Sequence, residues 1–347
     1  MKKQITLFCA FAFCAVALAD APTGYYSSAE GKKGEALRTA LQGIIDNHTV
    51  ISYDDLEEYY PDIDARKDNP NLVWDIYSTC EFTFSDANCQ QKAICDCWNK
   101  EHTVPQSWFN KKSPMKSDLF HVLPTDARVN NYRSNYAYGE VSDHSSLDGS
   151  EYALGWRSGK TFEPADEFKG DIARIYFYMA TRYANQCESW GGGMFGSAAS
   201  GFTTSIATML MKWARNDAVS EKETLRNDAV YKVQKNRNPF VDHPELSEYI
   251  WGDKKGQAWY SNGSTVIKTS TIAGLEIYPN PAKDFVTVTA EADEISYSIV
   301  SLSGQTFAQG NITSGQTISL ENLQTGVYLL KINANGRQQI EKLLITK

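Results

Sequence analysis

The spacing of apolar residues divides the chain into a helical part and a β part. Before residue 190, two stretches repeat an apolar residue every three or four positions, which predicts helices with one buried face. A third helix is expected over residues 204–214, whereas after residue 272 short runs of alternating residues separated by Gly, Asn and Pro predict strands. The helical stripes are Ala36, Leu37, Ala40, Leu41, Ile44 and Ile45, and Ile172, Ile175, Tyr176, Met179, Ala180 and Tyr183; the alternating runs hold Phe285, Val286 and Val288, Ile295, Tyr297 and Ile299, Ile318 and Leu320, and Val327, Leu329 and Leu330. The sequence therefore predicts an α+β chain in which a mostly helical domain precedes a small C-terminal all-β sandwich.

The first nineteen residues have the pattern of an export signal. Lys2 and Lys3 precede an apolar core, which ends at the small-residue pattern of residues 17–19. Cys14 follows Phe13 rather than a small residue, which disfavours the alternative of a lipoprotein. We expect a signal peptide over residues 1–19, a helical domain over 20–253, a linker rich in Lys, Gly, Ser and Thr over 254–272, and a β domain over 273–347.

Composition limits the classes of function. The chain has 347 residues, of which 42% are hydrophobic and 22% charged, as in ordinary globular proteins. After the N-terminal signal, no uninterrupted apolar run approaches the length of a membrane-spanning helix. The formal net charge of -8 gives no overall attraction to nucleic acid. Binding of a polyanion would therefore need a local basic patch or a bound cation.

Five cysteines remain once the signal is removed. Four of them lie close together in the sequence, namely Cys80, Cys89, Cys95 and Cys97, while Cys187 stands alone. Their spacing lacks the C-x-x-C pairs of a four-sulfur zinc site, and export makes disulfides admissible, so disulfides are favoured over a metal. The pairing of the four stays open, and Cys187 is expected to be free or to pair with another chain.

Polar residues suited to hydrolysis gather between residues 101 and 133. Glu101 and His102 begin this group, and Asn130 and Arg133 end it. An imidazole accepts a proton near neutral pH, and carboxylate and amide oxygens favour Mg²⁺ or Ca²⁺ over zinc. A lone histidine is more often structural, so it is the combination that indicates a metal-assisted site. The glycine run at residues 191–193 lacks the ending of a phosphate loop and is expected to be a flexible connection.

Three segments of the helical domain form a recognisable set: they read EHTVPQSWF at 101–109, SDLFHVLPTD at 117–126 and NNYRSNY at 130–136. These segments resemble the secreted endonuclease I family of ββα-metal (His-Me finger) nucleases. The resemblance spans about residues 25–253, with further matching blocks at 162–164, 168–174 and 236–245.

The β part has motifs of its own, which read IYPNP at 277–281, GVY at 326–328 and KLLITK at 342–347. Through them, residues 273–347 resemble the sorting domain of type IX secretion.

The resemblance implies a two-stranded ribbon packed on a helix, embedded in the helical domain. His102 would follow the first strand and act as the general base. Glu101 and Asn130 would be the protein ligands of one Mg²⁺, with Mn²⁺ or Ca²⁺ as alternatives, whose bound water protonates the leaving 3′ oxygen and gives 5′-phosphorylated products. Arg133 is the candidate for holding a nonbridging phosphate oxygen. Further candidates for substrate contact are Arg128, Lys116 and Arg174.

Structural roles compete with several of these assignments. An ion pair within the fold would occupy a basic side chain that otherwise meets the substrate. Lys116 stands where some family members have an acid, so a role tied to that acid is not expected here. The structural alternatives are a pair of Arg133 with Asp118 or Glu140, a surface pair of Asp171 with Arg174, a hydrogen bond at His121, and a helix N-cap at Asp126.

We therefore expect a secreted or surface-located, metal-dependent endonuclease. It would hydrolyse DNA and RNA with little sequence preference, act as a monomer without a membrane span, and engage the secretion machinery through residues 273–347. One rival is a catalytically silent surface protein that binds polyanions through the same fold and tolerates the loss of Glu101, His102 or Asn130. The other is a structural calcium protein, which predicts no nuclease activity with any metal.

Overall fold

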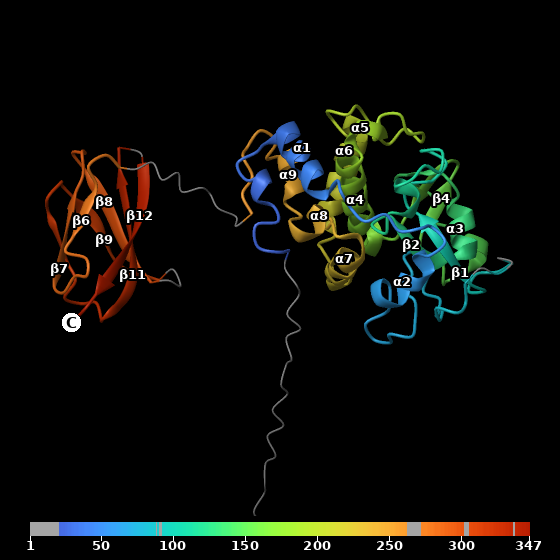
Figure 1. Cartoon of the computed structure of the whole chain (residues 1–347), viewed down its shortest axis with the longest axis horizontal. Coiled ribbons are helices and arrows are strands. Elements are labelled where there is room, and N and C mark those ends of the chain that lie inside the picture. Colours follow the sequence, from blue (N-terminus) through green and yellow to red (C-terminus); the bar gives the residue numbers. More distant parts are fainter. Residues whose placement is uncertain (1–20, 88, 90–91, 262–271, 302–304, 336) are drawn as a thin grey trace, which may run out of the picture. The chain divides into compact units, whose positions relative to one another are not determined.

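The computed structural model describes residues 21–87, 89, 92–261, 272–301, 305–335 and 337–347, which form two compact units (Figure 1). The first unit ends at Trp259 and the second begins at Tyr260. The expected signal peptide lies outside the described residues, as does most of the expected linker. Trp259 is fully buried in the first core, and its backbone N–H donates to the oxygen of Lys32. The packed first unit therefore extends into the segment that was expected to be a linker.

The three predicted helices are present in the first unit. They are α1 (Gly34–Ile45), α4 (Asp166–Arg182) and α6 (Thr204–Asn216). α4 lies in the middle, with α1, α6 and α8 (Pro239–Asp242) packed against it (Figure 1). All residues from Gly170 to Arg182 are buried, so α4 is covered on every side and not along one stripe.

Further helices surround this centre. They are α2 (Leu56–Ile63), α5 (Ala184–Cys187), α7 (Glu221–Gln234) and α9 (Leu246–Ile250). α7 begins with a capping box, because the Ser220 side chain accepts from the backbone of Glu223 while the Glu223 carboxylate accepts from the backbone of Ser220. Short 3₁₀ turns lie at Ser27–Ala29, Met115–Ser117 and Leu147–Gly149.

A two-stranded antiparallel ribbon runs directly into a short helix. β1 (Trp98–His102) pairs with β2 (Val122–Asp126), with His102 opposite Val122, and α3 (Ala127–Arg133) follows without a loop. The Asp126 carboxylate starts α3 by accepting from the backbone N–H groups of Arg128 and Val129, each at 2.8 Å. The N-cap alternative for Asp126 is therefore confirmed, and the cap fixes the helix relative to the ribbon.

A small sheet and two disulfides adjoin the ribbon. β3 (Ala137–Tyr138), β5 (Thr161–Glu163) and β4 (Trp156–Ser158) pair in that order. Disulfides join Cys80 to Cys95 and Cys89 to Cys97, so the preference for disulfides over zinc is confirmed. Cys187 is free and buried, and burial raises the pKa of its thiol to about 11.

Two glycines of the run at residues 191–193, which was expected to be a flexible connection, pack against Trp108. All three glycines are exposed, and nothing lies within 4 Å of a Cβ added at Gly193. The backbone N–H of Gly191 donates to the oxygen of Trp108 at 3.1 Å. A Cβ added at Gly192 would lie 2.1 Å from the Trp108 ring, and Gly192 has a φ of 79°. Glycine is required here because the indole occupies the space of a side chain.

The second unit consists of two antiparallel sheets. One has the strand order β10 (Thr317–Ser319), β7 (Phe285–Thr289), β6 (Glu276–Tyr278). The other has the order β12 (Arg337–Ile345), β11 (Gly326–Ala334), β8 (Ile295–Val300), β9 (Thr306–Ile312). In β11 the buried face holds Tyr328, Leu330 and Ile332, whereas Val327, which belongs to one of the alternating apolar runs, is 37% exposed.

The α+β prediction is confirmed by these elements. Within the described residues, no helix has the length and apolar content needed to cross a bilayer.

Candidate active site

A cavity of about 590 Å³, here called the His102 pocket, lies at the end of the ribbon. It brings together all four residues that the sequence assigned to catalysis and metal binding, namely Glu101, His102, Asn130 and Arg133. Its walls come from β1, α3, the loop after β1 and the segment before α2. The remaining lining residues are Tyr53, Asn99, Lys100, Pro105, Gln106, Ser107, Lys111, Asn131, Ser134 and Asn135.

The imidazole of His102 is held in one orientation. Its Nε2 lies 2.9 Å from the backbone oxygen of Lys116. Since a carbonyl only accepts, Nε2 carries the proton, and Nδ1 of the neutral ring keeps its lone pair. The ring of Tyr53 stacks on the imidazole with a centroid distance of 5.6 Å, and His121 meets it edge-on at 5.5 Å. The contacts leave His102 only 5% exposed.

The surroundings of His102 favour its neutral form. Burial lowers its pKa to about 3, and nearby His121, Lys116 and Arg133 act in the same direction. The hydrogen bond to the Lys116 oxygen favours the charged form, but burial outweighs it. The ring is therefore an uncharged proton acceptor at neutral pH.

Glu101 lies beside His102 in a buried network. Its Oε1 accepts from the Tyr77 hydroxyl at 3.0 Å and lies 3.2 Å from Nη1 of Arg133. The Tyr77 hydroxyl in turn bonds to that of Tyr138. Burial raises the pKa of Glu101, while the charge of Arg133 opposes the rise. The network fixes the carboxylate at the wall of the pocket.

Arg133 is anchored within the fold. It is 1% exposed, and its guanidinium donates to the backbone oxygens of His102 at 3.0 Å and Thr103 at 2.5 Å, besides pairing with Glu101. The structural pairs considered from sequence do not form, because Asp118 accepts from Tyr178, Tyr183 and Gln234, and Glu140 pairs with Lys212. Arg133 therefore ties the carboxylate of Glu101 to the end of β1.

Asn130 presents an amide oxygen to the same pocket. Its Nδ2 donates to Oδ1 of Asn99 at 2.6 Å and to the backbone oxygen of Lys100 at 3.4 Å. The Lys100 oxygen only accepts, which assigns the donor nitrogen to this side and makes Oδ1 the acceptor end of the amide. One carboxylate and one amide oxygen fit a hard cation that keeps several waters. In the described part of the chain, no group of three or more His, Cys, Asp or Glu side chains is placed to hold a metal ion.

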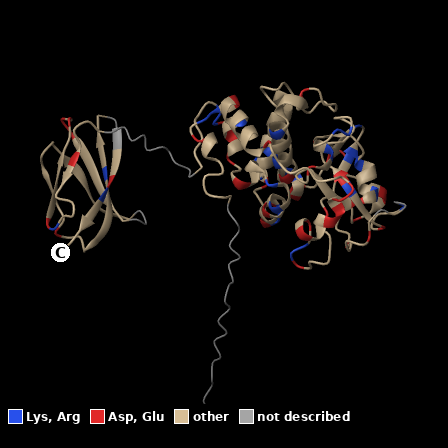
Figure 2. Ribbon diagram, viewed as in Figure 1, with Lys and Arg blue, Asp and Glu red and all other residues tan. Residues whose placement is uncertain are grey.

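The remaining basic candidates lie in different settings. The ammonium of Lys116 lies 4.3 Å from the centroid of the Tyr53 ring, at the edge of the pocket. Arg128 pairs with Asp148 through two nitrogens, at 3.1 and 2.8 Å. Basic and acidic residues are interspersed over the first unit (Figure 2), so the charge around the pocket matters more than the overall charge. Lys111 lines the pocket, and so does Lys100, whose ammonium pairs with Glu57 at 2.6 Å.

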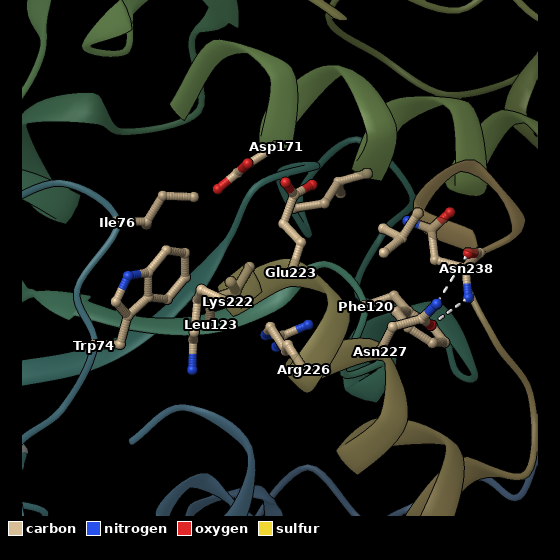
Figure 3. Close-up of a pocket in the computed structure, with 12 residues that line it drawn as sticks. Trp74, Ile76, Phe120, Leu123, Asp171, Lys222, Glu223, Arg226, Asn227 and Asn238 are labelled. Atoms are coloured by element: carbon tan, nitrogen blue, oxygen red, sulfur yellow. Dashed lines mark hydrogen bonds between the residues drawn. The ribbon is translucent and has the colours of Figure 1, made fainter. Parts of the chain in front are cut away.

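Arg174 lies away from the His102 pocket, in a buried cluster between α4 and α7. It is 1% exposed and pairs with Glu223 at 2.5 Å and Asp171 at 3.1 Å. The expected pair of Asp171 with Arg174 therefore forms, but in the interior and not on the surface. Asp171 and Glu223 line a cavity of about 30 Å³ with Lys222 and other residues (Figure 3), and burial raises the pKa of Asp171.

His121 has the structural hydrogen bond that the sequence favoured. Its Nε2 lies 2.6 Å from the backbone oxygen of Met115, and the residue is fully buried. The hydrogen bond to Met115 fixes the His121 ring, whose edge-on contact with His102 helps to hold the His102 imidazole in place.

Sequence reasoning missed Tyr53, Asn99 and Tyr77. Asn99 was within reach of a sequence argument, because it stands two residues before Glu101 on the same strand and thus on the same face. Tyr53 and Tyr77 meet the site only through the tertiary fold, which no local pattern indicates.

Comparison with known proteins decides the family. Residues 33–245 match the family described as Endonuclease I. The chain belongs to the endonuclease I family. Its last part, residues 276–346, matches the family described as secretion system C-terminal sorting domain. This endonuclease I family member is a phosphodiester hydrolase that is secreted or located at the cell surface.

Curated relatives of this family member include extracellular and periplasmic nucleases. It is 35% identical over 240 residues to an extracellular ribonuclease of Bacillus amyloliquefaciens, covering 65% of this chain and 78% of that protein. The corresponding protein of Bacillus subtilis (strain 168) is 34% identical over 235 residues, with the same coverage. A periplasmic deoxyribonuclease of Aeromonas hydrophila is 23% identical over 150 residues, covering 42% of this chain and 56% of that protein.

Proposed function

We propose that this nuclease hydrolyses DNA and RNA at internal phosphodiester bonds with little sequence preference and leaves 5′-phosphorylated ends. The observation that carries the proposal is the meeting of Glu101, His102 and Asn130 in one pocket. Relatives named as ribonucleases and as deoxyribonucleases support activity on both polymers.

In this proposal His102 is the general base. Nδ1 takes a proton from the water that attacks the scissile phosphorus, because Nε2 is already occupied as the donor to Lys116. The new bond joins the water oxygen to phosphorus, the bond between phosphorus and the 3′ oxygen breaks, and the leaving 3′ oxygen takes up a proton from water. A positioned base of this kind contributes about 10²–10⁴ in rate.

Glu101 and Asn130 are proposed to hold one Mg²⁺, with Mn²⁺ or Ca²⁺ as alternatives. When bound, the ion neutralises the negative charge that builds up on the scissile phosphate. Tyr77 and Arg133 keep the Glu101 carboxylate in place, and Asn99 orients the Asn130 amide. Arg133 thus acts chiefly as a positioning residue for Glu101, and it also lines the pocket in which the substrate phosphate is proposed to bind.

Substrate contacts are proposed for Lys116, whose ammonium lies over the Tyr53 ring at the edge of the pocket, and for Lys111, which lines the pocket. Lys100 also lines the pocket, but its ammonium pairs with Glu57 at 2.6 Å, so it is a weaker candidate. Arg128 is a weaker candidate because Asp148 pairs with it, and Arg174 has no place in this proposal. With a net charge of -8, binding rests on these local contacts and is sensitive to salt.

Residues 273–347 are proposed to carry the enzyme through type IX secretion. Truncation after residue 272 should leave nuclease activity unchanged but keep the protein within the cell envelope. Loss of activity on truncation would mean that the β unit is not a separate sorting unit.

The experiment for the main proposal uses the mature protein with plasmid DNA and with a structured RNA. Both should be degraded in Mg²⁺ and protected by a chelator, and end analysis should find 5′ phosphates. Survival of both polymers across the metals and pH values tried, or 3′-phosphorylated ends, would contradict the proposal.

A further inference from the structure

The loop that follows β1 forms a wall of two neighbouring pockets. Its residues Pro105, Gln106, Ser107 and Lys111 line the His102 pocket. Trp108, Phe109, Asn110 and Lys112 line a second cavity of about 200 Å³, here called the indole pocket. Ser107 and Trp108 are consecutive in the chain yet belong to different pockets, so the two cavities share this loop as their partition. The indole pocket is completed by Met115, Asn185, Gln186, Ser189 and Trp190.

The partition is held in a fixed shape. Asn110 and Lys111 both have left-handed backbones, with φ of 55° and 54°. The backbone N–H of Lys111 donates to the oxygen of Gln106 at 2.8 Å, which closes the loop. On the other side, Gly191 and Gly192 pack against the Trp108 ring. Left-handed backbone at non-glycine residues costs energy, and it persists where the surrounding contacts enforce it.

The inner surface of the indole pocket is apolar and aromatic. Trp108 and Trp190 are each 8% exposed, and Phe109 and Met115 are almost fully buried below them. The rings of Phe109 and Trp190 lie 5.5 Å apart. Little of these rings reaches the cavity, so the apolar contact that they offer an occupant comes from their exposed edges.

The rim of the pocket is made of amides. Asn110, Asn185 and Gln186 are exposed, and within the described residues their side-chain amides have no hydrogen-bond partner. Each amide offers donors and an acceptor side by side, the pattern that base edges complement. Lys112 adds one cation at the rim. The volume, below that of a drug-sized site, suits one ring system.

We propose that the indole pocket is a nucleobase subsite, which takes an unpaired base of the substrate strand beside the phosphate held in the His102 pocket. This inference rests on the proposed function, because it identifies the occupant as part of a nucleic acid. The amides of the rim recognise the edge of the base through hydrogen bonds, and the exposed edges of the two indoles add apolar contact. The subsite contributes to binding of single-stranded substrate and not to the chemical step.

A binding experiment tests the subsite without cleavage. AMP, CMP, GMP and UMP are titrated into the full-length His102→Ala variant while tryptophan fluorescence is followed, with ribose 5-phosphate as the probe that lacks a base. The nucleotides should bind more tightly than ribose 5-phosphate. The Asn185→Ala/Gln186→Ala double change should weaken nucleotide binding about tenfold, the loss expected for two hydrogen bonds, and leave ribose 5-phosphate unaffected.

The matched control is Gln257→Ala, which removes an exposed amide of the same unit outside both pockets. It should bind nucleotides as the parent does. Nucleotides that bind no better than ribose 5-phosphate, or an affinity that survives loss of both amides, would overturn the subsite.

Kinetics separates this inference from the proposed function. In the active enzyme, the double variant should raise KM for short single-stranded oligonucleotides about tenfold and leave kcat unchanged. A wild-type enzyme that cuts oligonucleotides while the double variant keeps the same KM would refute the subsite alone. A wild-type enzyme that cuts no nucleic acid would refute the proposed function. In that case the nucleotide titration would still show whether the indole pocket binds a base.

Discussion

The Nε2 atom of His102 lies 2.9 Å from the backbone oxygen of Lys116, and this contact assigns the tautomer of the ring. The nitrogen that faces a carbonyl is the one that carries the proton, which leaves Nδ1 to receive another. The 3₁₀ turn at Met115–Ser117 supplies that oxygen, so a turn between the two strands of the ribbon sets the chemistry of a residue at the end of β1.

Replacement of Tyr53 should disturb this imidazole. Tyr53→Leu removes the ring that stacks on His102 and that also lies within 4.6 Å of the ammonium groups of Lys100 and Lys116. We expect kcat to fall about tenfold, in line with the loss of a well-positioned general base. Tyr53→Phe keeps the stack and should retain most of the activity. If Leu and Phe are equally active, the ring does not position His102.

Replacement of Asn99 should weaken metal binding without touching a ligand. Asn99→Ala removes the partner that orients the Asn130 amide at 2.6 Å. Loss of such a supporting group typically costs about 10–100-fold in metal affinity. Calorimetric titration with Mn²⁺ measures the change, with Asn130→Ala as the reference for loss of the ligand itself. Unchanged affinity in Asn99→Ala together with lost affinity in Asn130→Ala would exclude the supporting role.

The sequence predicted the parts of the site that lie close together along the chain, and it missed those that the tertiary fold brings in. Glu101 and His102 adjoin in one strand and Asn130 follows on the next helix, so the family pattern brought them together correctly. The role of Arg133 depends on where its long side chain ends. Its guanidinium is buried against the backbone oxygens of His102 and Thr103, a tertiary contact that local sequence does not indicate. The same holds for Tyr53, which lies before α2 and reaches the site across the fold.

The fold likewise has features that local sequence patterns predict and features that depend on tertiary packing. Periodicity located α1, α4 and α6, because amphipathic spacing is a local property. It did not indicate that α4 is buried on all sides, since that depends on which helices pack around it. Disulfide pairing was equally out of reach, because four cysteines allow three connectivities.

The two disulfides should support the stability of the ribbon region. The backbone N–H of Cys95 donates to Oδ2 of Asp126 at 2.7 Å, which links the disulfide loop to the cap of α3. Closing the 15-residue loop between Cys80 and Cys95 is worth about 3 kcal/mol in the chain-entropy account. Cys80→Ala/Cys95→Ala should lower the free energy of unfolding in urea by about that amount. Cys187→Ala is the control, since it removes a thiol that forms no disulfide; equal stability of the double variant and the parent would contradict the prediction.

Lys222 should make stability depend on pH. Its ammonium donates to the backbone oxygens of Ile63 and Ala65 in a buried position, and burial lowers its pKa to about 8 from 10.5 in the unfolded chain. Below pH 8 the folded protein holds a charge that burial disfavours, and above it the folded protein loses the proton before the unfolded chain does. Stability contributed at this site therefore rises between pH 8 and 10.5.

Lys222→Met tests this linkage. Relative to the variant, the wild type should gain about 2 kcal/mol of unfolding free energy between about pH 7 and pH 9.5. Lys232→Met, which replaces an exposed lysine of the same helix, is the matched control. If the stabilities of the two variants depend on pH in the same way, the rise in stability does not come from Lys222.

The central claim is that the imidazole of His102 performs the chemistry and does not hold the fold or the metal. The most direct measurement compares the rate of plasmid cleavage by the wild type and His102→Ala in Mg²⁺, with Mn²⁺ affinity and thermal unfolding measured on the same preparations. We predict a fall in rate of about 10²–10⁴-fold with metal affinity and folding retained. Cleavage by His102→Ala at a rate near that of the wild type would contradict the account.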